Sequence, residues 1–185
     1  MPRIRINRSD AAGFVWGFAE ATIFFVVPDI LLSWLALRSV KRALTASVWV
    51  MTGALLGGTC IWILGRLDAG SGATAFAALP AISEAMITNV REQLVASGPV
   101  AILFGPISGT PYKIYALQAG SLGIGIVPFI LISIPARLIR FIMVIALVSA
   151  VGHLLGRWLD AGMRQTVLAV AWVMFYCWYF YAMAP

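Results

Sequence analysis

Five charged residues lie within otherwise apolar stretches of the sequence and are the candidates for chemistry. They are Glu20, Asp29, Lys113, Arg137 and Arg140. At membrane depth an unpaired charge costs about 2.5–3.5 kcal/mol on insertion scales, so such residues are paired, hydrated or part of a working site. Three basic groups against two carboxylates leave one surplus positive charge. Because guanidinium groups bind phosphate oxygens in a forked geometry, this combination favours an anionic ligand.

The same charges also have purely structural interpretations. The acids would serve only the fold if they pair with the arginines, for instance Asp29 with Arg137. Asp29 follows Pro28 and could instead cap a helix. The arginines could snorkel to the membrane surface, and Lys113 could anchor a hairpin end at the interface. The arrangement that we favour sets the two acids against the two arginines, with Lys113 reaching the same cavity from the opposite side.

The composition places the chain among integral membrane proteins. The mean hydropathy is +0.95, and 62% of the 185 residues are hydrophobic while 11% are charged. Residues 1–185 are therefore predicted to form a single membrane domain. The formal charge of +6 comes from short basic clusters beside apolar stretches, which set topology rather than bind nucleic acid. For Cys60 and Cys177 we expect neither a disulfide nor a metal site, and we expect no cofactor. A cleaved signal peptide is also not expected, because Glu20 interrupts the first apolar run.

The first apolar stretch, 11–37, is broken near Pro28 and has a basic cluster at each end. These flanking residues are Arg3, Arg5 and Arg8 before it and Arg38, Lys41 and Arg42 after it. Short basic flanks lie on the cytoplasmic side, so both ends belong on that side of the plasma (inner) membrane, with the N-terminus in the cytoplasm. The stretch is therefore predicted to enter the bilayer, turn and leave again as a re-entrant hairpin, a form tolerated where backbone is buried or lines a wet cavity.

A second re-entrant hairpin, entered from the opposite side, is predicted over 99–120. Its helix breakers are Gly105, Pro106, Gly109 and Pro111, and the segments on either side are too short to span the bilayer. The two opposed hairpins, each followed by a spanning helix, form the inverted-repeat pattern of many transporters.

The remaining elements complete an all-α integral membrane protein. Spanning helices are predicted over 44–65, 122–152 and 165–182, and an interfacial amphipathic helix over 74–97. The 44–65 helix carries Gly53 and Gly57, a spacing that lets another backbone approach closely. The last helix ends in aromatic residues over 175–181, as in an aromatic belt at the membrane interface. Whether the chain forms a homo-oligomer is left open.

Three stretches of the sequence resemble the DedA/VTT (SNARE-associated) superfamily, most closely its short YqaA-like branch. They are Phe18-Ala-Glu20 with Val27-Pro28-Asp29, then Gly105-Pro106 through Ala119-Gly120, and then Pro128-Phe129 to Arg137-x-x-Arg140-Phe141. The resemblance covers 13–156. It implies two facing re-entrant hairpins and the movement of lipids, such as phospholipids or polyprenyl phosphates, across the bilayer. Proton-coupled transport is also discussed for this superfamily. Typical members carry two arginines around the proline of the second hairpin, where this chain has Leu103 and Gly109.

Two functions are therefore carried forward. The preferred one is a lipid translocase or scramblase in which a polar cavity shelters an anionic lipid headgroup. The alternative is a proton-coupled secondary transporter of a small solute, with Glu20 or Asp29 exchanging protons. An enzyme is disfavoured because the sequence has one histidine and no recognisable pairing of nucleophile and base. A pure scaffold would not need four charges at membrane depth.

Overall fold

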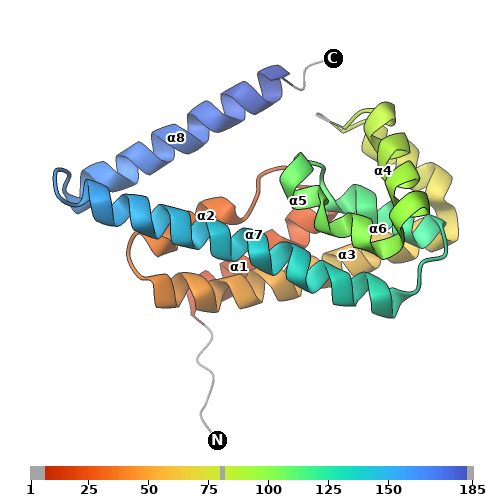
Figure 1. Cartoon of the computed structure of the whole chain (residues 1–185), viewed down its shortest axis with the longest axis horizontal. Coiled ribbons are helices and arrows are strands. Elements are labelled where there is room, and N and C mark those ends of the chain that lie inside the picture. The colour runs from red at the N-terminus through yellow and green to blue at the C-terminus, as the bar shows by residue number, and fades with distance from the viewer. Residues whose placement is uncertain (1–6, 80–81, 183–185) are drawn as a thin grey trace, which may run out of the picture.

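The protein is described by a computed structural model that covers residues 7–79 and 82–182. Within these ranges the chain is helical and contains no strand (Figure 1). The elements are, in order, α1 (Arg8–Thr22), α2 (Asp29–Ala36), α3 (Val40–Ala77), α4 (Glu84–Ser97), the 3-10 helix η1 (Gly98–Leu103), α5 (Gly105–Ser108), α6 (Tyr112–Ser121), α7 (Ile126–Leu155) and α8 (Ala161–Ala182). Three of them, α3, α7 and α8, are long and apolar enough to cross a membrane. The predictions of an all-helical chain and of membrane-spanning helices are confirmed.

The first hairpin, α1 and α2, turns back beside the middle of α3. α1 runs in the same direction as α3, because Gly17 lies against Val50 and Phe18 lies against Gly57, further along. The chain then breaks over residues 23–28, and Pro28 stands at the start of α2. α2 runs along α7 toward the end of the molecule where α3 begins (Figure 1). The outer basic residues Arg3 and Arg5 lie outside the described residues.

The second hairpin, η1 and α5 followed by α6, meets the first one at the same level. Its turn uses Gly109, whose φ of +74° lies in the left-handed region that favours glycine, and Pro111 precedes α6. α6 begins with Tyr112 against Gly58 of α3, one residue beyond the point where α1 ends. The tips of the two hairpins therefore face each other near the middle of α3.

α3 is the common support of both hairpins, and glycines make the contacts close. A Cβ atom on Gly53 would lie 2.0 Å from the carbonyl oxygen of Phe14 in α1, and one on Gly65 would lie 2.0 Å from that of Leu117 in α6. Only a residue without a side chain fits at such distances. The close approach predicted from Gly53 and Gly57 is confirmed, and α1 is the helix that makes it.

Between residues 65 and 97, the helices begin and end at other residues than the sequence predicts. α3 continues to Ala77 through a kink at Asp68, whose φ and ψ are −153° and 79°, and the Asp68 carboxylate accepts a hydrogen bond from the Ser71 amide at 3.0 Å. That bond lets a new helical turn begin directly after the kink. The amphipathic segment predicted as one helix over 74–97 is therefore divided between the end of α3 and α4. The apolar stripe of α4, with Val90 and Leu94, is buried against the protein core.

α7 and α8 form the outer layer, and α8 packs only loosely on the rest of the protein. α7 packs on α3 in the opposite direction, with Gly152 near its end against Leu37. α8 starts four residues before the predicted 165, because the Asp160 carboxylate accepts the Met163 amide at 2.8 Å and so caps the helix. None of its residues 161–182 is buried, and in Figure 1 it leaves the body of the molecule. Cys60 and Cys177 are free and exposed.

Candidate functional site

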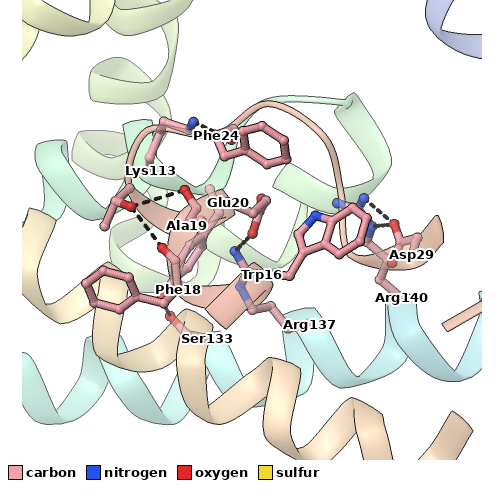
Figure 2. Close-up of polar contacts among 12 residues, drawn as sticks. Trp16, Phe18, Ala19, Glu20, Phe24, Asp29, Lys113, Ser133, Arg137 and Arg140 are labelled. Atoms are coloured by element: carbon pink, nitrogen blue, oxygen red, sulfur yellow. Dashed lines mark hydrogen bonds and ion pairs between the residues drawn. The ribbon is translucent and has the colours of Figure 1, made fainter. Parts of the chain in front are cut away.

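The first ion pair joins the end of α1 to the middle of α7. Arg137 donates from Nη2 to Oε2 of Glu20 at 2.7 Å, and both side chains are nearly inaccessible, at 6% and 9% exposed. The guanidinium also lies over the ring of Tyr112, 4.1 Å from its centroid, a cation–π contact that further offsets the burial of the charge. Arg137 therefore does not snorkel to the surface. Figure 2 shows the pair between α1 and α7.

The second ion pair lies one helical turn further along α7. Arg140 donates from both Nε, at 2.8 Å, and Nη2 to the same oxygen of Asp29. The Asp29 side chain is 3% exposed, whereas that of Arg140 is 30% exposed. Our trial pairing of Asp29 with Arg137 is wrong: Asp29 is the first residue of α2, and this start places it beside the later arginine. Asp29 does not cap α2 either, since Pro28 occupies the cap position.

Each ion pair leaves one buried polar atom unused. Among the described residues, Oδ1 of Asp29 and Nε of Arg137 are buried without a hydrogen-bond partner. A buried acceptor and a buried donor that lack partners are costly in a site that serves packing alone. They are compatible with a site that takes up a polar ligand or water.

Lys113 reaches the same region from the second hairpin. Its side chain is buried, with the residue 1% exposed, and Nζ donates to the carbonyl oxygen of Phe24 at 2.9 Å and lies 4.5 Å from the centre of the Phe25 ring. Both contacts are to the turn of the first hairpin, as Figure 2 shows for Phe24. Within residues 7–79 and 82–182, no carboxylate lies within 4.0 Å of the amine. Burial rules out a simple interfacial anchor.

All five predicted charges border one cavity of about 470 Å³ between the hairpin tips, α7 and α8. Of the hairpin breakers, Gly105, Pro106, Gly109 and Pro111 line it, while Pro28 is buried and is not among the lining residues. Among the described residues, these five are the charged side chains in the lining, and they give the cavity a formal charge of +1. The structure thus brings together every predicted site residue except Pro28.

Aromatic side chains complete the site, and sequence reasoning did not assign them to it. Tyr176 of α8 accepts a hydrogen bond from the Val27 amide at 2.8 Å, and the indole of Trp16 donates to the Val26 carbonyl at 2.7 Å. The two side chains thereby bind backbone groups of the non-helical stretch 23–28, which have no partner within a helix. The sequence places Tyr176 in the predicted aromatic belt, and only its spacing to Trp172, one helical turn away, signals a shared inward face.

The described residues contain no group of three or more histidine, cysteine, aspartate or glutamate side chains arranged to hold a metal ion. No family model, no curated protein and no solved structure matches the chain. Its function therefore has to be argued from the site.

Proposed function

We propose that this protein is a membrane lipid translocase or scramblase that moves a phosphate-bearing lipid, a phospholipid or a polyprenyl phosphate, across the bilayer. The observation that carries the proposal is one cavity bordered by three basic and two acidic side chains between two hairpin tips. The headgroup would pass through this cavity while the tails stay in the bilayer. The proposal is in keeping with the resemblance to the DedA/VTT superfamily.

The distribution of the charges supports an anionic headgroup. The charge of Arg137 is neutralised by Glu20, and both side chains of this ion pair are buried. Lys113, in contrast, is held by a backbone carbonyl and an aromatic ring, so its charge has no carboxylate within ion-pair distance among the described residues. Arg140 is the most exposed member and can turn part of its guanidinium toward the cavity. A phosphate between Lys113 and Arg140 would neutralise the surplus charge through charge-assisted hydrogen bonds.

The membrane placement is part of the proposal. We place both hairpins as re-entrant segments that enter from opposite sides of the plasma (inner) membrane, with the N-terminus in the cytoplasm and α4 at the interface. Irregular backbone at membrane depth is tolerated where it lines a cavity. The contacts of the two hairpins with α3 support this arrangement, because α1 lies along α3 up to Gly57 and α6 lies along it from Gly58 onward.

A proton-coupled transporter of a small solute is the second candidate. It is favoured by one observation, the buried Oδ1 atom of Asp29, which has no hydrogen-bond partner among the described residues and belongs to a cavity-lining side chain. Such an oxygen can take up a proton without breaking a contact. Binding of the proton would weaken the attraction to Arg140 and free that guanidinium for an anionic solute.

The test is flip of a headgroup-labelled phosphate lipid in proteoliposomes. We compare the parent with Asp29→Asn/Arg140→Gln, which removes both charges of the second pair, so that neither partner is left as an unpaired buried ion. The control is Arg91→Gln, because Arg91 hydrogen-bonds to Gln118 and Ser121 and does not line the cavity. We expect flip without a proton gradient in the parent and control, and a loss of about tenfold or more in the double variant, the equivalent of one charge-assisted hydrogen bond.

Two results would contradict this function. Equal flip by the double variant would remove the second ion pair from the mechanism. Absence of flip in the parent, together with solute uptake that depends on a proton gradient, would establish the transporter instead.

A further inference from the structure

A second hollow lies beside the charged cavity, between α2 and α8. It has a volume of about 600 Å³, and the described residues that line it include no charged side chain. Ile30 and Trp34 form the α2 wall, and residues from Leu168 to Phe180 form the α8 wall. We call it the α2–α8 groove. A groove with this lining suits a hydrocarbon ligand and no polar one.

The groove and the charged cavity are continuous. Leu168, Trp172 and Tyr176 line both. Two of them also fasten α8 to the first hairpin, because Tyr176 accepts from the Val27 amide and Trp172 donates to Ser33 Oγ at 3.2 Å. A molecule that spans this junction would place a charged end among the arginines and Lys113 and an apolar end along α8.

The length of the groove fits one lipid chain. Leu168 and Phe180 are twelve positions apart on α8, which corresponds to about 18 Å along a helix. One leaflet of hydrocarbon is half of the roughly 30 Å core, or about 15 Å. A hydrocarbon chain that lies along the whole groove would therefore be about as long as one leaflet is deep.

We propose that the α2–α8 groove holds one hydrocarbon chain of the amphiphile whose anionic headgroup enters the charged cavity. This inference rests on the proposed function and adds to it: the ligand is bound at both ends, and α8 serves as the wall along which its tail lies. The loose packing of α8, in which no residue is buried, leaves this wall free to adapt to the chain.

The experiment uses phosphatidic acid with a photoreactive group in one acyl chain, as a trace component of phosphatidylcholine vesicles that contain the full-length protein. Cross-linked sites are mapped by mass spectrometry. The groove-filling variant is Val173→Trp, and the matched control is Val170→Trp, because both valines are exposed on α8 but only Val173 lines the groove.

We expect labels on the groove face, around Val173 and Cys177, that unlabelled phosphatidic acid removes and added phosphatidylcholine does not. Val173→Trp should lower this labelling about threefold, which corresponds to about 0.6 kcal/mol, because its indole occupies the groove. Val170→Trp should not lower it, because Val170 does not line the groove. Labelling spread evenly around α8, or equal labelling of both variants, would overturn the inference. So would disulfide cross-linking between Cys177 residues of two chains with no lipid label, which would assign the groove to a second copy.

Failure of the inference and failure of the proposed function give different results. If Asp29→Asn/Arg140→Gln loses flip while Val173→Trp keeps both flip and labelling, the tail site is wrong and the translocase stands. If the groove is labelled and competed as expected but the parent protein flips no lipid, the chain binds the amphiphile without translocating it.

Discussion

The first hairpin carries Glu20 and Asp29 to the middle of α3, and the second carries Lys113 to the same level. Both acids are met by arginines from α7. Lys113 is met by a backbone carbonyl and an aromatic ring of the opposite turn. Two segments that occupy equivalent places on α3 therefore differ in how their charges are satisfied.

Under the proposed function, this difference separates charges that stabilise the fold from a charge that attracts the ligand. A buried ion pair is strongly disrupted when one partner is removed, because the remaining charge is left uncompensated. A lysine that has no carboxylate partner leaves no such charge behind. We therefore expect the Glu20–Arg137 pair to contribute most to folding, and Lys113 of the second hairpin to contribute to ligand binding with little effect on folding.

The largest effect should follow loss of one member of the first ion pair. Arg137→Met leaves the Glu20 carboxylate buried and unpaired, and we expect a loss of about 3–5 kcal/mol in the free energy of unfolding. Adding Glu20→Gln should recover most of this loss. The measurement is equilibrium unfolding in mixed micelles. Stability of the single variant equal to that of the parent would mean that the pair does not hold the hairpin.

Both hairpins contact α3 through glycines, and we expect substitution of these glycines to lower the stability by a smaller amount. Gly53→Ala and Gly65→Ala each place a Cβ atom 2.0 Å from a carbonyl oxygen, and we expect each to cost about 1–3 kcal/mol of unfolding free energy. Gly70 is the control, because a Cβ there meets only the Asp68 carboxylate at 3.7 Å. Gly70→Ala should be neutral or stabilising by about 0.5–1 kcal/mol. Unequal losses for Gly53 and Gly65 would show that one hairpin is held more loosely.

The smallest change in stability should come from Lys113→Met. The lost ammonium–carbonyl bond, worth about 1.5–3 kcal/mol, is offset because a charge no longer has to be desolvated, so we expect a net change within about 1 kcal/mol. Lipid flip should nevertheless be lost, since the uncompensated positive charge of the cavity is gone. Parallel unfolding and flip measurements check both halves. The proposed difference between the hairpins would be wrong if Lys113→Met were destabilised as strongly as Arg137→Met, or if it flipped lipid at the rate of the parent.

Much of the fold follows from local properties of the sequence. The lengths of the apolar stretches predict the three long helices, and Gly53 with Gly57 predicts the close contact on α3. That the buried acids face the buried arginines was also predictable, because isolated charges would be too costly at membrane depth. The partner of each acid was not. Arg137 and Arg140 lie one turn apart on α7, and the choice between them depends on where α2 begins, which only tertiary packing sets.

Other features depend on contacts that no local pattern contains. At the Asp68 kink, the aspartate side chain accepts a hydrogen bond from a backbone amide of the next helical turn. The composition of this stretch indicates only a change from apolar residues to glycine, serine and charged residues. Tyr176 belongs to an aromatic segment typical of a membrane interface, and its bond to Val27 joins residues 149 positions apart. Single-sequence reasoning has no means to place one tyrosine of that segment in a cavity.

The spacing of the ion pairs along the chain has a consequence for biosynthesis. Glu20 and Arg137 are 117 residues apart, and Asp29 and Arg140 are 111 apart. At the usual 5–20 residues per second of translation, each acid is made about 6–23 s before its arginine. During that interval the first hairpin cannot complete its native contacts, and its carboxylates must stay in water or within the insertion machinery. The ion pairs therefore hold the first hairpin only after translation has passed Arg140.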